Sequence, residues 1–298
     1  MMKSILKILV ITLITVGIQS CKSVDLRTEV VLNNPNSDEQ KGKQLLEKAV
    51  KAMGYDKLTD AQVYEVTAQF NWKGIWLTMP MNALPGNNKK DIKFRFVTNS
   101  FDGQVEYLEG RKKGTIQGLQ SWEGYKTEVK SDYLKQHEHD RYIWGLATYH
   151  YLLEAPYRIL NECDVMRYAG ETKFQGKAFD LVYATWGTEA PNKKYDRWLI
   201  YINKETGFID MLQVTINDFF LPMPKGMQHA TVHIEREKTS IGTHMPNNVI
   251  IQLKSPKKKE SKVYSFALRD YRFDTFSKET LYPIDDLKFY GNSKPEAE

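Results

Sequence analysis

Residues 62–72 read QVYEVTAQFNW, and this stretch decides the fold. Its odd positions carry mostly polar side chains such as Glu65 and Gln69, whereas its even positions are apolar or aromatic: Tyr64, Val66, Ala68, Phe70 and Trp72. Successive side chains of a β-strand point to opposite faces of the sheet. The alternation therefore predicts a strand with one buried face and one face toward solvent.

The chain continues in the same pattern after this strand. Ile92, Phe94 and Phe96 alternate with charged residues, and the Asp102-Gly103 dipeptide that follows predicts a tight hairpin turn. Further strands are expected at residues 177–186, 197–203, 208–217, 229–237, 247–254 and 262–273. Short polar connections between them predict an antiparallel meander. The lack of a Gly-rich strand-to-helix turn disfavours a nucleotide-binding α/β fold.

One helix precedes the strands and a second interrupts them, which predicts an α+β fold. The first is expected to begin at Ser37, because Ser37 and Gln40 have the spacing of a capping box, and to end at Gly54. The second is expected at residues 138–153, because Pro156 lacks the backbone N–H that a continuing helix needs. This second helix is so rich in aromatic and aliphatic side chains that it must lie on or inside the sheet.

The N-terminus has the pattern of a secretory signal peptide, residues 1–20. Lys3 and Lys7 precede the apolar run of residues 8–18, whose helical length of about 16 Å is half of a bilayer core of ~30 Å. The run ends in Ile18-Gln19-Ser20-Cys21, which resembles the lipobox of bacterial lipoproteins and implies cleavage before Cys21 and acylation of its thiol. The alternative is an ordinary signal peptide with an incidental cysteine.

The mature chain then divides into a flexible tether at residues 21–37, a single domain at 38–290 and a disordered tail at 291–298. Lys22 follows the cysteine where inner-membrane lipoproteins carry aspartate, which by resemblance favours a lipid-anchored location at the outer membrane of a Gram-negative cell, facing the periplasm or the surface. The chain has a net charge of only +5, too mild to indicate a nucleic-acid partner. With two cysteines it has no disulfide scaffold, and Cys163 is expected to be buried and inert.

Several segments resemble the LolA/LolB-like superfamily of envelope lipoprotein-sorting proteins, most closely its uncharacterised lipoprotein branch. They are Phe94-Arg95-Phe96 followed by Phe101-Asp102-Gly103, then residues 151–159 (YLLEAPYRI), 176–182 (GKAFDLV) and 198–207 (WLIYINKETG). The resemblance covers most of residues 38–275. It implies an incomplete antiparallel β-barrel, or half-barrel, wrapped around helices, with a concave apolar face that holds acyl chains.

This resemblance and the aromatic content of the strands predict a monomeric, non-enzymatic carrier without a cofactor. Its partners would be the membrane, through the anchor, and a hydrophobic small molecule or lipoprotein acyl chain. An apolar concave face is where such a ligand binds, and the expected lining residues are Phe70, Trp72, Phe94, Phe96, Trp144 and Trp198. The alternative is that these side chains only form the core. A lid or rim is expected from Trp76, Met79, Phe219, Phe220 and Leu221; for the first two an ordinary strand and turn is the alternative.

Metal and catalytic sites fit the sequence less well. On a strand, His229 and His233 lie about 13 Å apart and cannot share one metal ion. Residues 137–140 (HEHD) are explained by a polar helix start. Glu106, Glu109 and Glu123 are the carboxylates that a glycosidase would use, but solvated strand faces explain them too. No metal site is therefore expected.

Two other functions remain open from the sequence. One is a surface lipoprotein that binds or degrades glycans, with aromatic side chains stacked on sugar rings. The other, also found in the superfamily, is a sensor domain that passes an envelope-stress signal to a partner protein. The basic run Lys257-Lys258-Lys259 is expected at a solvated hairpin tip, with contact to anionic lipid headgroups as the alternative.

Overall fold

The computed structural model describes residues 38–78, 82–128, 131–137, 140–187, 194–217, 229–253 and 262–284. The predicted signal peptide, Cys21, the tether, Met79, Phe219 to Leu221, Lys257 to Lys259 and the tail lie outside these residues. None of the helices in the described ranges is long and apolar enough to cross a membrane.

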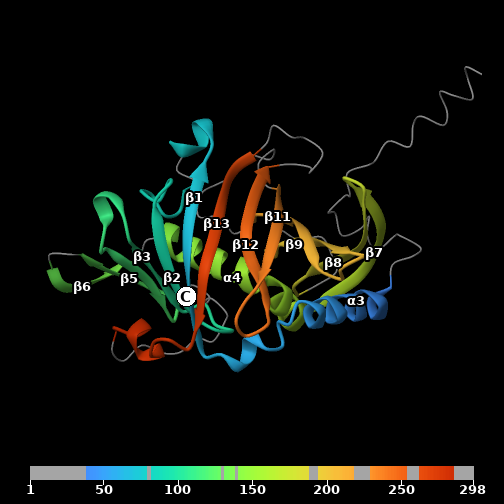
Figure 1. Cartoon of the computed structure of the whole chain (residues 1–298), viewed down its shortest axis with the longest axis horizontal. Coiled ribbons are helices and arrows are strands. Elements are labelled where there is room, and N and C mark those ends of the chain that lie inside the picture. The colour runs from blue at the N-terminus through green and yellow to red at the C-terminus, as the bar shows by residue number, and fades with distance from the viewer. Residues whose placement is uncertain are drawn as a thin grey trace, which may run out of the picture.

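The fold is one open antiparallel sheet of 13 strands that curves around a long helix (Figure 1). The first six strands are β1 (Val63–Trp72), β2 (Asp91–Val97), β3 (Gly103–Tyr107), β4 (Ile116–Gln120), β5 (Glu123–Glu128) and β6 (Ser131–His137). The other seven are β7 (Val165–Phe174), β8 (Lys177–Thr185), β9 (Arg197–Asn203), β10 (Ile209–Thr215), β11 (His229–Lys238), β12 (His244–Leu253) and β13 (Lys262–Phe273). The predicted α+β half-barrel is thus confirmed.

Two meanders make up this sheet. Strands β1 to β6 run outward in chain order to one edge, and β7 to β13 return from the opposite edge. The two halves meet where β1 pairs with β13, with Phe70 opposite Phe266 and Trp72 opposite Tyr264. Helix α4 (Asp140–Glu162) carries the chain from the edge strand β6 to the edge strand β7, behind the central strands in Figure 1.

The even positions of strand β1 have the burial that the alternation predicts, whereas Val63 and Glu65 on the predicted solvent face are buried as well. The side chains of Tyr64, Val66, Ala68 and Phe70 are fully buried, and Trp72 is nearly so. The same is true of Ile92, Phe94 and Phe96 on β2. The predicted strands between residues 177 and 273 are all present, and their ends lie within three residues of the predicted ones.

The hairpin between β2 and β3 has its turn earlier than predicted. Val97 N–H donates to the Asp102 carbonyl at 3.0 Å, so the turn lies at residues 98–101 and Gly103 already pairs with Phe96. A Cβ on Gly103 would lie 2.3 Å from the Phe96 ring. The glycine is therefore needed for close strand packing rather than for the turn.

The prediction that the second helix ends before Pro156 was wrong. Helix α4 continues through it to Glu162. Proline costs about 3 kcal/mol in a helix interior, but Leu152, Leu153 and Ile159 on both sides of it are buried. Burial of each such side chain stabilises by about 1.5–3 kcal/mol. The Leu153 carbonyl, close to the interrupted ladder, also accepts a hydrogen bond from Tyr55 Oη at 2.8 Å.

Strands β4, β5, β6 and β7 were not predicted from the sequence. β4 and β5 have only five and six residues, IQGLQ and EGYKTE, and lack a run of alternating apolar side chains. Gly118 on β4 packs under the Tyr125 ring of β5, where a Cβ would lie 1.9 Å from ring carbon Cζ. Glycine in a strand often marks such a close approach.

Helix α3 (Glu39–Ala52) covers the edge strand β7, as Figure 1 shows. Asp38 caps it by accepting a hydrogen bond from Lys41 N–H at 2.8 Å, close to the predicted start. Gly42 lies against the backbone of β7, where a Cβ would be 2.6 Å from the Arg167 carbonyl carbon. The helix can thus approach the sheet edge closely and shield part of its unpaired backbone.

Gly42→Ala tests this contact. In a free helix the change would stabilise by up to about 1 kcal/mol, whereas here overpacking against rigid backbone is expected to destabilise by about 1–3 kcal/mol. The free energy of unfolding from urea titration measures the effect, with exposed Lys43→Ala as the control. Equal or greater stability of Gly42→Ala would contradict the close packing.

Candidate functional site

The predicted ligand-lining residues of β1 and β2 lie directly under helix α4. The rings of Phe70 and Phe94 lie 5.0 and 5.8 Å from the ring of Tyr149, centre to centre. Phe96 stacks on His150 at 4.0 Å. These side chains are fully buried, so the concave face of the sheet is filled by α4 in this structure.

The three predicted tryptophans are more spread out. Trp72 stacks on Tyr264 at 4.2 Å, and the Trp198 ring lies 5.6 Å from that of Tyr151 on α4. Trp144 is partly exposed on α4. The indole N–H groups of Trp72 and Trp198 are buried without a hydrogen-bond partner among the described residues. A ligand role for these aromatic side chains stays a prediction.

Three charged or polar side chains form a fully buried network along one face of α4. Glu154 accepts from Arg158 Nε at 2.8 Å, and its other carboxylate oxygen lies 2.9 Å from His150 Nε2. The Arg158 guanidinium donates to the Ser100 carbonyl, and Asn99 N–H donates to Glu154 at 3.2 Å. The network therefore fastens the β2–β3 turn to α4.

The electrostatics of the network keep Glu154 ionised and His150 neutral. Burial acts to raise the pKa of Glu154, but attraction from Arg158 and hydrogen bonds from His150 and Arg158 outweigh it, and the pKa lies below its ordinary value. Burial lowers the pKa of His150 despite the opposing charge of Glu154. His150 Nδ1 has no partner in the described part of the chain. A proton there would be an unpaired buried donor, which agrees with the lowered pKa.

The loop of residues 82–90, called the cap loop below, closes one end of this interior. Asn88 Oδ1 accepts from Trp72 N–H at 2.9 Å, and Lys89 N–H donates to the Phe70 carbonyl at 2.6 Å. Ala83 and Leu84 are fully buried, and a Cβ on Gly145 of α4 would lie 2.5 Å from Ala83 Cβ. The cap loop thus lies between the predicted aromatic residues and the outside.

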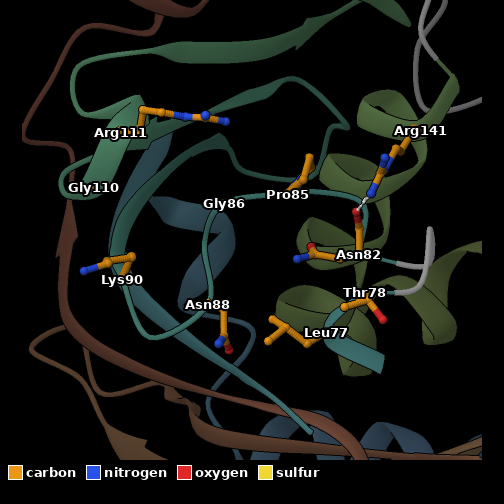
Figure 2. Close-up of a pocket in the computed structure, with 10 residues that line it drawn as sticks. All are labelled: Leu77, Thr78, Asn82, Pro85, Gly86, Asn88, Lys90, Gly110, Arg111 and Arg141. Atoms are coloured by element: carbon orange, nitrogen blue, oxygen red, sulfur yellow. Dashed lines mark hydrogen bonds between the residues drawn. The ribbon is translucent and has the colours of Figure 1, made fainter. Parts of the chain in front are cut away.

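A pocket of about 530 Å³ lies on the outer side of the cap loop (Figure 2). Four segments line it: the 3-10 turn η2 (Gly74–Leu77) with Thr78, the cap loop, the 3-10 turn η3 (Gly110–Lys112), and the start of α4. The lining residues are Leu77, Thr78, Asn82, Pro85, Gly86, Asn88, Lys90, Gly110, Arg111 and Arg141. The volume is typical of small-molecule sites.

Positive charge and the apolar side chain of Leu77 meet at this pocket. Arg111 and Arg141 extend toward it from opposite sides in Figure 2. Arg141 Nε donates to the Asn82 carbonyl at 2.9 Å. Leu77 is 46% exposed, and Ile75 in the same turn is 68% exposed. The predicted rim residue Trp76 lies between them and packs partly on the core.

Sequence reasoning missed Arg111, Arg141 and the cap loop. The available signals were the basic residues Lys89, Lys90 and Arg111 to Lys113, but nothing in their spacing shows that they meet Arg141 across the fold. Of the residues expected to form a rim, Trp76 lies in η2 next to the pocket-lining residue Leu77, and its rim role stays a prediction.

The other predicted chemical groups are engaged elsewhere. His229 and His233 lie on strand β11, where His233 Nε2 is 3.0 Å from Gln252 Oε1. Glu106 pairs with Arg95 at 3.1 Å. Cys163 is buried, and burial raises the pKa of its thiol well above the ordinary value. Among the described residues no group of three or more His, Cys, Asp or Glu side chains could hold a metal ion.

No family model and no curated protein matches this chain. Among solved structures, it is similar to a putative outer membrane lipoprotein-sorting protein domain from Vibrio parahaemolyticus, with 8% identity and a TM-score of 0.49 over 82% of this chain and 97% of that one. A LolA superfamily protein from Nitrosomonas europaea aligns with 9% identity and a TM-score of 0.48, covering 80% and 96%. A DUF1329 family protein from Desulfovibrio piger aligns with 12% identity and a TM-score of 0.47, covering 81% and 96%. At these identities and TM-scores neither a family nor a function is carried over to this chain.

Glu154→Gln tests the buried network. The change removes the closer and fully buried counter-charge of the Arg158 guanidinium, and loss of one partner of a buried pair costs about 3–5 kcal/mol. Glu162 also pairs with Arg158, at 3.4 Å, but its side chain is 23% exposed. Glu162→Gln is therefore the matched control and should cost under about 1 kcal/mol. Urea unfolding of both variants measures the difference, and similar losses would argue against a network centred on Glu154.

Proposed function

We propose that this chain is a non-enzymatic binding protein of the cell envelope, and that its half-barrel takes a hydrophobic or amphiphilic ligand, either a lipid or the acyl part of another lipoprotein. The observation that carries the proposal is the pocket beside the exposed turn η2, at the cap-loop end of an aromatic interior. Exposed apolar side chains next to a concave site commonly contact a ligand, a partner or a membrane.

The ligand chain lies first on Leu77 and Trp76 in this proposal. Leu77 lines the pocket, and Trp76 connects the turn to the core. Below the cap loop are the predicted lining residues Phe70 and Trp72, whose backbones the loop holds by hydrogen bonds. A longer chain reaches them by displacing the cap loop from Gly145 of α4.

A non-enzymatic role fits the chemistry of the buried groups. The Cys163 thiol is disfavoured as a nucleophile, since burial keeps it protonated. Glu154 and His150 face each other inside the core and hold the β2–β3 turn. Their place in that network supports a structural role, rather than a catalytic one, for both side chains.

Leu77→Asp is expected to weaken ligand retention by about tenfold, equal to about 1.4 kcal/mol, because it places a charge on the apolar wall of the pocket. The full mature chain with Cys21→Ser is expressed in the periplasm, and native mass spectrometry with solvent extraction measures the bound lipid. Ile75→Asp, on the same turn but outside the pocket lining, is the matched control. The proposal would be refuted if the Cys21→Ser chain with its native pocket carried no lipid and also resisted loading with fatty acid or phospholipid.

Cys21 is the proposed anchor, and the lipobox-like segment Ile18 to Cys21 supports it. Attached acyl chains each add membrane affinity of about 0.8 kcal/mol per buried CH₂. The wild-type chain should incorporate an alkyne-labelled fatty acid and fractionate with outer membranes, whereas Cys21→Ser should do neither. Unlabelled wild-type chain would show an ordinary signal peptide instead.

A further inference from the structure

We infer that the pocket beside the cap loop binds the anionic group of the ligand, a phosphate carried by a lipid headgroup, with Arg111, Arg141 and Lys90 as its counter-charges. The inference rests on the proposed function and names the ligand class: an anionic amphiphile, held by its charge in the pocket and by its chain on Leu77. The same chemistry would accept free phosphate, and the experiment below separates the two sources.

The first support is convergence of positive charge from separate parts of the chain. Lys90 comes from the cap loop, Arg111 from η3 and Arg141 from the start of α4, and all three line one pocket. Arginine suits phosphate because its planar guanidinium can donate two parallel hydrogen bonds. In the described ranges none of these three side chains forms a salt bridge with a carboxylate.

The second support is a lysine next to the pocket. Lys112 Nζ donates to the carbonyl of Pro85, a pocket residue, at 2.6 Å and lies 4.9 Å from the Tyr107 ring centre. Burial lowers the pKa of Lys112 to about 8, and repulsion from Lys126, Arg141 and Arg111 adds to this. The charged groups that act on Lys112 are thus cations, so an anion placed among them relieves their repulsion.

The acidic residues next to Lys90 and Arg111 in the sequence do not offset the charge of these two side chains. Asp91 follows Lys90 but forms an ion pair with Arg269 and accepts from Gln69 at 3.0 Å. Glu109 precedes Gly110 and accepts from Asp91 N–H at 3.2 Å. Both carboxylates are therefore engaged with the β1–β2 face rather than with the arginines of the pocket.

The third support is the apolar turn at the same site. Leu77 lines the same pocket as the polar cap-loop residues Asn82 and Asn88 (Figure 2). A free inorganic anion gains nothing from an exposed leucine, whereas an amphiphile buries its chain on it while its headgroup meets the arginines. The combination of charge and apolar surface thus favours a lipid over free phosphate.

The test compares three probes on the full mature chain with Cys21→Ser after removal of bound lipid. Lysophosphatidylglycerol carries one phosphate charge, monoacylglycerol with the same acyl chain is neutral, and inorganic phosphate has no chain. Isothermal titration below the critical micelle concentration should show lysophosphatidylglycerol binding about tenfold more tightly than monoacylglycerol. Added salt should reduce the preference, because it screens the charges.

Arg111→Gln should remove most of this preference and leave monoacylglycerol affinity unchanged. Lys113→Gln is the matched control, since it removes one charge beside the same turn but from a residue outside the pocket lining. Between pH 7 and 9 the affinity for lysophosphatidylglycerol should also fall, as Lys112 loses its proton while the phosphodiester charge stays constant. Circular dichroism of each variant confirms that it is folded.

The possible results separate the two proposals. Equal binding of both lipids, or equal effects of Arg111→Gln and Lys113→Gln, would overturn the anionic pocket and leave lipid binding intact. Binding of inorganic phosphate alone, abolished by Arg111→Gln, would support the anion site but refute the lipid proposal. No binding of any probe would overturn both.

Discussion

The burial of helix α4 against the curved sheet is the contact on which the rest of the structure depends. Tyr149 meets Phe70, Phe94 and Phe266 from three neighbouring strands, and Arg158 ties the other end of the helix to the β2–β3 turn. α4 also links the edge strands β6 and β7, so the helix that packs against the central strands connects the two halves of the sheet. The pocket depends on it as well, since Gly145 seats the cap loop and Arg141 reaches the pocket wall.

The interior and the pocket differ in their chemistry. Aromatic side chains fill the concave face. The buried polar network on α4 lies there too, and its members His150, Glu154 and Arg158 pair with one another. Outside the cap loop the balance changes to cations that form no salt bridge among the described residues, next to an exposed leucine. An amphiphilic ligand matches this division, because its two ends need opposite surroundings.

The sequence predicts those parts of the fold whose pattern is local. Alternation identified β1, β2 and the strands after residue 177, and the apolar content of residues 138–153 placed a helix against the sheet. The rule that proline stops a helix failed at Pro156, because buried neighbours on both sides outweigh the local cost. β4 and β5 escaped detection because they are short and polar. Arg111 and Arg141 meet only in the folded chain, so no spacing could pair them.

The pairing of β1 with β13 has a consequence for how the protein comes to its native state. Tyr64 finds its partner Phe273 about 200 residues later, and closure of such distant contacts slows folding. Until β13 is made, β1 and β12 each present an unpaired edge, and the aromatic face of β1 lacks Phe266 and Tyr264. The two meanders therefore stay unpaired with each other until nearly the whole chain is available. A chaperone that shields exposed strands would act before β13 pairs with β1.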